Sequence, residues 1–167
     1  GDGSVGEGAF YESLEVATVH QLGGVYICEN NGFLDPDMPG WRTGHTGGSR
    51  VPLAFDIPVS IVDGMDSGVL YRAASRAIDR ARRGGGPSFI EVRTYPSQAG
   101  HMDTVELPEG FTNLEPAVGL RPYDAGVSWY SLHDPVSRFA QELVIGEVLS
   151  AEEVLGIDKE IIVEPDD

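Results

Sequence analysis

Cysteine is almost absent from this sequence: Cys28 is the only one in 167 residues. A lone cysteine excludes a disulfide within the chain and is typical of a protein in a reducing compartment, so we expect a cytoplasmic location. Cys28 ends the short apolar run Val25-Tyr26-Ile27-Cys28. A cysteine in such a run is more typical of a small buried side chain than of a nucleophile.

Positive charge is scarce as well. The sequence has 11 lysines and arginines but 27 aspartates and glutamates, which gives a net charge of −16 at pH 7. This excess argues against direct binding to nucleic acid or to an anionic membrane surface. Apolar runs of about 20 residues, the length needed to span a bilayer, are absent too. The apolar fraction of 41% is nevertheless enough for a globular core.

Helical periodicity and apolar runs alternate along the first half of the chain. The spacing predicts helices over residues 8–22 and 67–83, and strands over residues 25–28, 59–62 and 88–95. Strands that alternate with helices are typical of a mostly parallel sheet with helices on both faces. We therefore predict an α/β fold.

Polar residues mark where several helices begin. Asp66 is predicted to cap the helix that follows it, because a side-chain oxygen at this position accepts from a free backbone N–H. Asp134 followed by Pro135 has the pattern of a capped helix start. Ser150 with Glu153 has the spacing of a capping box. These signals predict two further helices near the end of the chain.

The helix predicted over residues 67–83 is amphipathic. Its predicted buried face is apolar: Val69, Leu70, Ala73, Ala77, Ile78 and Ala81. A row of arginines on the other side is typical of a solvated face: Arg72, Arg76, Arg80 and Arg83. For the chain as a whole, we predict an α/β domain over residues 1–127 and a helical C-terminal extension over residues 128–167.

Two small-residue turns with oxygen-bearing side chains stand at opposite ends of the first predicted helix–strand pair. Gly1-Asp2-Gly3-Ser4 precedes the helix, and Asn31 follows the strand. In a parallel sheet both turns reach the carboxyl edge, where open α/β sheets bind ligands. The Asp2 carboxylate and the Asn31 amide oxygen suit magnesium or calcium, while Gly1 and Gly3 let the backbone approach a bulky anion. A diphosphate bridged by a divalent metal fits both turns.

The same residues carry a resemblance to a known family. Gly-Asp-Gly, then 26 residues, then Asn-Asn, resembles the thiamine diphosphate motif. The fuller pattern is similar to the α subunit of 2-oxo acid and acetoin dehydrogenase E1 components: Gly8-Ala9-Phe10, Glu12-Ser13-Leu14 and Ile27-Cys28-Glu29-Asn30-Asn31-Gly32-Phe33. The resemblance covers nearly the whole chain and is strongest over residues 1–33.

This resemblance implies a set of residues that bind thiamine diphosphate or Mg²⁺: Gly1, Asp2, Gly3, Ser4, Asn31, Phe33 and His101. Asp2, the side chain of Asn31 and the backbone carbonyl of Phe33 would hold the metal. The backbone N–H groups of Gly3 and Ser4 would meet the diphosphate. The implied fold is the thiamine diphosphate-binding fold, incomplete at its N-terminal side.

His101 is the catalytic residue that the resemblance implies. The stretch from Thr94 to His101 resembles a family passage in which a histidine lies beside the cofactor. Imidazole can stabilise an anion or move a proton there, because its pKa lies near neutral pH; a surface-loop histidine is the alternative. Met102 stands where the family usually has Ser, so we expect no regulation by phosphorylation at this position.

The implied activity is the thiamine diphosphate-dependent decarboxylation of a 2-oxo acid, or the cleavage of an acyloin, with acyl transfer. The family works as a heterotetramer in which a β-type E1 chain supplies the activating glutamate, so we expect an enzyme that is active only with its partner. A lipoyl-bearing acyltransferase is the implied acyl acceptor. A segment or second chain is expected to supply the N-terminal half, and without it one sheet edge would be uncovered.

Other functions stay open at this point. Residues 34–50 depart from the family pattern, which leaves a carboligase (acyloin synthase) of the same fold as an alternative. A non-catalytic assembly scaffold and an α/β anion-binding module unrelated to thiamine are further alternatives. Mg²⁺-dependent binding of thiamine diphosphate would separate the dehydrogenase and the carboligase from the scaffold and the anion-binding module.

Overall fold

The computed structural model of the chain describes residues 1–31, 48–94, 114, 118–119 and 134–163. The chain separates into two compact units, Gly1–Tyr95 and Pro96–Asp167. The predicted domain boundary at residue 127 lies outside the described residues, as do Phe33 and His101. The first unit contains the turn–helix–strand segment on which the sequence analysis centred.

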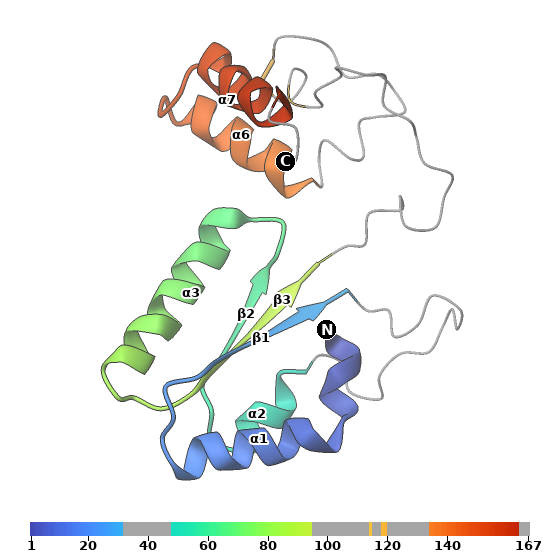
Figure 1. Cartoon of the computed structure of the whole chain (residues 1–167), viewed down its shortest axis with the longest axis vertical. Coiled ribbons are helices and arrows are strands. Elements are labelled where there is room, and N and C mark those ends of the chain that lie inside the picture. The colour runs from blue at the N-terminus through green and yellow to red at the C-terminus, as the bar shows by residue number, and fades with distance from the viewer. Residues whose placement is uncertain (32–47, 95–113, 115–117, 120–133, 164–167) are drawn as a thin grey trace, which may run out of the picture. The chain divides into compact units, whose positions relative to one another are not determined.

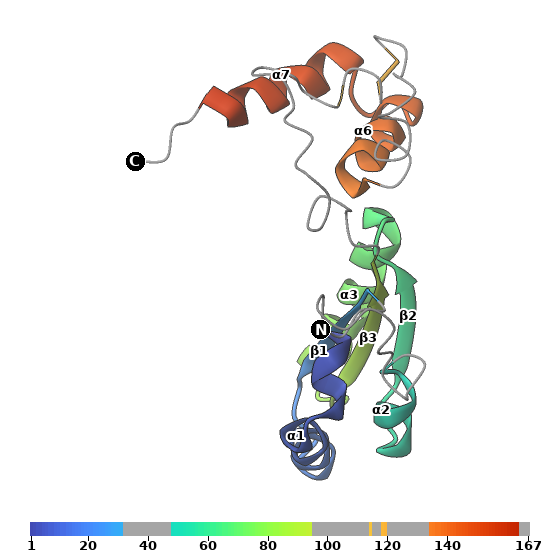
Figure 2. The ribbon, with the colours of Figure 1, turned by 90° about the vertical axis from the view of Figure 1, so that its right-hand side faces the viewer.

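The first unit is built on a three-stranded parallel sheet. Its strands are β1 (Val25–Asn30), β2 (Val59–Asp63) and β3 (Ser88–Arg93). Their order is β1-β3-β2, so the last strand in the chain lies between the other two (Figure 2). The parallel sheet confirms the predicted α/β class.

Helices cover both faces of this sheet (Figure 1). The 3-10 helix η1 (Asp2–Gly6), α1 (Gly8–Val19) and the short α2 (Arg50–Ala54) lie on one side. Helix α3 (Ser67–Arg82) lies on the other. The predicted helix over residues 67–83 is thus confirmed, and its Asp66 cap is confirmed by a 2.8 Å bond from the Val69 N–H to Asp66 Oδ1.

Each face of the sheet has its own core, because neighbouring residues of a strand point to opposite sides. On the α1 side the buried cluster consists of Val5, Leu14, Cys28, Val51, Ile57 and Phe89. On the α3 side it consists of Val62, Ala73, Ala77, Ile90 and Val92. Strand β3 is buried on both faces because it is the central strand. Cys28 is buried, as predicted.

Three details differ from the sequence-based expectation. Helix α1 ends at Val19 rather than at residue 22, since Gln21 adopts a positive φ of 49° and the Leu22 N–H closes back onto the Ala17 carbonyl at 2.9 Å. Ile78 of α3 is 41% exposed, because the narrow sheet covers only the side of the helix that carries Ala73 and Ala77. Helix α2 was not predicted.

The second unit contains helices α6 (Pro135–Ile145) and α7 (Ala151–Val163). Both predicted helix starts are confirmed. Asp134 Oδ2 accepts from the Ser137 N–H at 2.8 Å, and Ser150 and Glu153 exchange both bonds of a capping box, at 2.8 and 3.2 Å. The bond from the Ser150 backbone lowers the pKa of Glu153. A small core joins these helices: Leu114, Val118, Ala140, Val154 and Leu155. No helix in the described parts of the chain has the length and apolar character to cross a bilayer.

Candidate functional site

The 3-10 helix η1 places Asp2 beside the carboxyl end of β1 (Figure 1). A Cβ added to Gly1 would lie 4.0 Å from the Glu29 carbonyl oxygen, an ordinary van der Waals distance, so the start of η1 lies directly beside β1. Asp2 itself is only 6% exposed. A carboxylate is therefore held, largely shielded from water, at the sheet edge where ligands of open α/β proteins bind.

Gly48 lies between η1 and the sheet. A Cβ at this position would lie 2.8 Å from Val5 Cγ2, 3.3 Å from Cys28 Sγ and 3.5 Å from Phe89 Cζ. These distances show that Gly48 packs between η1, β1 and β3 with no room for a side chain. The segment that returns to the sheet at residue 48 thus helps to hold η1, and with it Asp2, in place.

Glu91 is the most deeply buried charged residue among those described, with no exposed surface. It lies in the middle of β3, where its Oε1 accepts from Asn30 Nδ2 at 2.9 Å and its Oε2 accepts from the Ser49 N–H at 3.2 Å. Arg93 Nε lies 3.6 Å from Oε1. Each carboxylate oxygen therefore has a donor from a different segment of the chain, which offsets the loss of hydration on burial.

Cys28 lies among the carboxylates of this region and is opposite Glu91 in the strand register. Burial is the main reason that the pKa of the Cys28 thiol rises from 9.0 to about 11; the positive charge of the N-terminal amine opposes the rise, and the negative charges of Asp2, Glu91 and Glu29 add to it. The thiol is therefore protonated at neutral pH and is no nucleophile. The same three carboxylates make the local electrostatic environment favourable for a cation.

The structure places the predicted site residues as follows. Asp2 is buried in η1, and Asn31 is exposed immediately after β1. The Ser4 N–H, predicted to meet a diphosphate, donates to the Gly1 carbonyl at 3.2 Å as part of the 3-10 turn. Phe33 and His101 lie outside the described residues, so their predicted roles stay predictions.

The donor set at this edge fits a hard divalent cation. One buried carboxylate, from Asp2, and one amide, from Asn31, are oxygen donors of the kind that Mg²⁺ prefers. Within the described residues no group of three or more His, Cys, Asp or Glu side chains is placed to hold a metal ion. The predicted set of one carboxylate, one amide and one backbone carbonyl is of a different kind, and it stays a prediction.

Sequence reasoning missed Glu91 and its contact with Ser49. The run Phe89-Ile90-Glu91-Val92 was interpreted as a strand with alternating faces, which would leave the glutamate on a polar face. The available signal was a single acidic residue inside an apolar strand. Such a residue becomes informative once β3 is known to be the central strand, because both of its faces are then buried.

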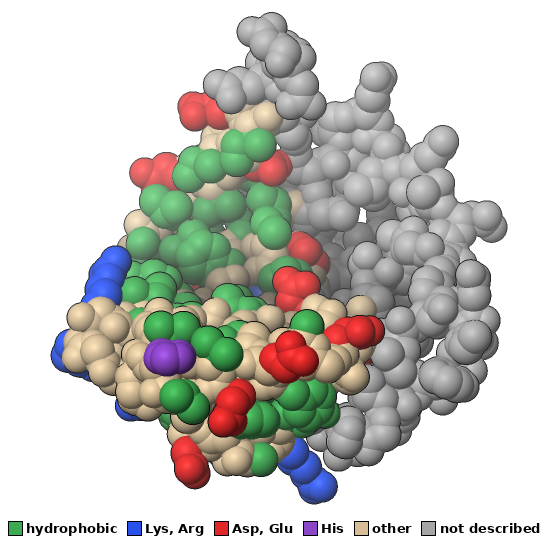
Figure 3. Space-filling model, turned by 60° about the horizontal axis from the view of Figure 1, so that its bottom comes forward, with side chains coloured by type: hydrophobic (Ala, Val, Ile, Leu, Met, Phe, Trp, Pro, Cys, Tyr) green, Lys and Arg blue, Asp and Glu red, His purple; other side chains and the backbone are tan. Residues whose placement is uncertain are grey.

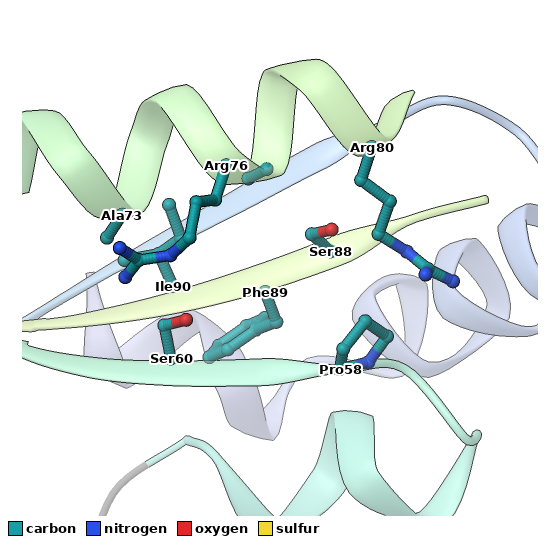
Figure 4. Close-up of a pocket in the computed structure, with 9 residues that line it drawn as sticks. Pro58, Ser60, Ala73, Arg76, Arg80, Ser88, Phe89 and Ile90 are labelled. Atoms are coloured by element: carbon teal, nitrogen blue, oxygen red, sulfur yellow. The ribbon is translucent and has the colours of Figure 1, made fainter. Parts of the chain in front are cut away.

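A pocket of about 150 Å³ lies on the opposite face of the sheet, between α3 and the amino ends of β2 and β3 (Figure 4). Arg76 and Arg80 reach from α3 toward Ser60 and Ser88 of the strands (Figure 4). The pocket is open because several side chains that line it are small, such as Ala73 and Ala77. The two exposed arginines border it with their aliphatic stems and charged heads. The pocket is not part of the Asp2 site, which is at the carboxyl edge on the α1 side.

The surface of the first unit carries apolar side chains between acidic ones (Figure 3). On α1 and the turn after it, Val16, Val19 and Leu22 are each about half exposed or more. Ile27 of the edge strand β1 is 57% exposed on the α3 side of the sheet. The outer backbone groups of β1 are not paired with any other described strand.

Known proteins resemble this chain over almost its full length. It matches the family described as "Dehydrogenase E1 component" over residues 1–165. The alpha subunit of acetoin:2,6-dichlorophenolindophenol oxidoreductase from Bacillus subtilis (strain 168) is 39% identical over 103 residues, 62% of this chain and 31% of that protein. The pyruvate dehydrogenase E1 component subunit alpha from Rhizobium meliloti (strain 1021) is 30% identical over 161 residues, 96% of this chain and 43% of that protein. The chain thus spans less than half the length of these relatives, and it belongs to the dehydrogenase E1 component family.

Proposed function

We propose that this chain is part of the α-type subunit of a thiamine diphosphate- and Mg²⁺-dependent E1 enzyme. The enzyme would decarboxylate a 2-oxo acid, or cleave an acyloin, and transfer the acyl group. The observation that carries this proposal is the buried Asp2 carboxylate, held by η1 beside the carboxyl end of β1 in a chain of this family. The low cysteine content supports a cytoplasmic location.

The cofactor would be held by residues of this chain. Asp2 and Asn31 would bind Mg²⁺ through their side-chain oxygens, and Phe33 would contribute its backbone carbonyl. Gly1 and Gly3 would let the backbone approach the diphosphate. The Ser4 N–H, which donates to Gly1 in the structure, would have to turn from that carbonyl toward the diphosphate.

Thiamine diphosphate, when bound, supplies the nucleophilic carbon and the electron sink that cleavage next to a carbonyl requires. The residues of this chain would bind and orient it, and η1 with Gly48 would exclude water from the Asp2 side. His101 would hold or move a proton beside the cofactor. The glutamate that activates the cofactor would come from a β-type partner chain.

Exposed apolar surface supports a partner or further segment next to β1. Val16, Val19 and Leu22 of α1 and the turn after it are exposed, as is Ile27 of the edge strand itself. An exposed strand edge with apolar neighbours is favourable for pairing with another strand. We infer that the N-terminal half of the enzyme covers this edge, that a β-type chain completes a heterotetramer, and that a lipoyl-bearing acyltransferase accepts the acyl group.

A thermal-shift series on the assembled protein tests the cofactor assignment. Mg²⁺ with thiamine diphosphate should raise the melting temperature, and Mg²⁺ with ATP should not. Asp2→Ala and Asn31→Ala should abolish the response. Asp66→Ala is the matched control, because it removes a helix cap worth about 1 kcal/mol and should lower the melting temperature while the response to the cofactor persists.

The outcomes separate the alternatives. An equal response to ATP would favour a general anion-binding module, and no response to either would favour a scaffold. Retention of the response in Asp2→Ala would reject the metal assignment. If the response is present, reduction of 2,6-dichlorophenolindophenol with pyruvate or with acetoin identifies the substrate class. Formation of an acyloin instead would identify a carboligase.

A further inference from the structure

We propose that Glu91 is a positioning residue for the Mg²⁺-dependent cofactor site. Its buried carboxylate holds together the end of β1 and the segment that returns at Ser49, and so orients the backbone from which Asn31 projects. This inference rests on the function proposed above. Glu91 itself contacts neither the cofactor nor the metal in this account; it acts through Asn30 and Ser49.

The first observation is the completeness of its burial and bonding. A fully buried carboxylate is retained only where donors compensate the lost hydration. Glu91 has one donor on each oxygen, Asn30 Nδ2 at 2.9 Å and the Ser49 N–H at 3.2 Å. Both bonds cross between segments far apart in the sequence, so they constrain the tertiary structure and not a single turn.

The second observation is the position of the two donors. Asn30 is the last residue of β1 and immediately precedes Asn31, one of the two side chains proposed to bind the metal. Ser49 follows Gly48, which packs against Val5 of η1, the 3-10 helix that carries Asp2. One carboxylate therefore bonds to the residue next to Asn31 and to the segment that packs against the 3-10 helix of Asp2.

Simple removal of the carboxylate would take the acceptor away from the Asn30 amide and from the buried Ser49 N–H, so the test needs a variant that keeps both hydrogen bonds. Glu91→Gln has one acceptor and one donor, so it bonds to both Ser49 and Asn30 only if the Asn30 side-chain amide rotates to present its oxygen, which changes the residue next to Asn31. Asn30→Asp alone would set a carboxylate against a carboxylate. In the double variant Asn30→Asp with Glu91→Gln, the glutamine amide donates to the new carboxylate while its carbonyl accepts from the Ser49 N–H. The negative charge moves from β3 to the neighbouring strand β1, and both bonds are restored.

The measured quantities are the dissociation constant of thiamine diphosphate at saturating Mg²⁺ and the Mg²⁺ concentration that half-saturates binding, in the assembled protein. Each single variant should raise the half-saturating Mg²⁺ concentration about 10- to 100-fold, the range typical of residues that orient metal ligands. The double variant should return to within about 3-fold of the wild type, because coupled residues are not additive. Glu15→Gln, the same substitution on an exposed residue of α1, should stay within about 2-fold.

Melting temperatures of the cofactor-free proteins separate positioning from stability. A purely structural role would lower the melting temperature of Glu91→Gln and leave the Mg²⁺ half-saturation of the folded protein unchanged, and that result would overturn the inference. A double variant that binds no better than Glu91→Gln, or that fails to fold, would also overturn it. Absence of Mg²⁺-dependent binding in the wild type would instead reject the proposed function.

Discussion

Gly48→Ala is a direct test of how η1 is held against the sheet. The added Cβ would lie 2.8 Å from Val5 Cγ2, whereas carbon atoms in contact are normally about 3.5–4.0 Å apart. Val5 would have to retreat by several tenths of an ångström or more. Val5, Cys28 and Phe89, which surround the site, are each at most 4% exposed, so they have little room to move. Overpacking of this kind costs about 1–3 kcal/mol.

The melting temperature of the assembled protein should therefore fall by several degrees, at about 2–4 °C per kcal/mol for a protein of 150–250 residues and less for a larger one. Because η1 is a short surface element, it should give way before the central strand does. The displacement would carry Asp2 with it, and the affinity for thiamine diphosphate in the presence of Mg²⁺ should fall as well. Differential scanning fluorimetry and calorimetric titration measure the two effects.

Two control variants make this prediction specific. Gly8→Ala places the same methyl group where nothing lies within 4 Å, and it should be neutral or slightly stabilising because alanine favours helix. Val5→Ala removes the clashing methyl group, so the double variant with Gly48→Ala should lose less stability than the sum of the two single losses. Wild-type stability of Gly48→Ala, or simple additivity in the double variant, would refute the packing described here.

Four further predictions concern other parts of the chain. Cys28 should react with iodoacetamide at least about 100-fold more slowly in the folded protein at pH 8 than in urea, because a pKa of about 11 leaves only about 0.1% thiolate; equal rates would contradict its burial. The folded state holds this proton more tightly than the unfolded state, so the metal-free protein should lose stability as the pH rises from 9 toward 11, and Cys28→Ala should lose less over that interval. Gly64→Ala should destabilise by about 1–3 kcal/mol in urea unfolding, since the new Cβ would lie 2.8 Å from the Arg93 carbonyl oxygen; an unchanged midpoint would contradict this. His101→Ala should bind the cofactor normally but lower turnover about 10²- to 10⁴-fold, and unchanged turnover would return His101 to the surface-loop alternative.

The parts of the fold that depend on local sequence were predictable. The cap at Asp66, the helix start at Asp134-Pro135 and the Ser150–Glu153 capping box each depend on residues at most three positions apart. The alternation of strands and helices predicted the parallel sheet for a similar reason, because periodicity is visible within one element. These elements were all confirmed.

Features that depend on the order of strands were not predictable. Nothing within β3 indicates that it lies between β1 and β2, and only that position buries both of its faces, Glu91 included. The same limit explains Ile78, whose exposure depends on how much of α3 the sheet covers. Glu91 and Ser49 are 42 residues apart in the chain, a separation that local patterns do not report.

The candidate site was predictable in part. Spacing and residue chemistry pointed to Asp2 and Asn31, and the structure places Asp2 in a buried position at the expected edge of the sheet. What the sequence did not reveal is which contacts surround the two turns: Gly48 packs against Val5 of η1, and Glu91 bonds to Asn30 and Ser49. The roles of Phe33 and His101 stay predictions.

A crystal structure of the assembled protein grown with Mn²⁺ in place of Mg²⁺ and with thiamine diphosphate tests the central claim most directly. The anomalous signal of manganese locates the metal independently of the model built around it. We predict one strong peak bonded to a carboxylate oxygen of Asp2, the amide oxygen of Asn31 and the diphosphate. A manganese peak elsewhere, or a diphosphate bound without contact to Asp2, would contradict the account.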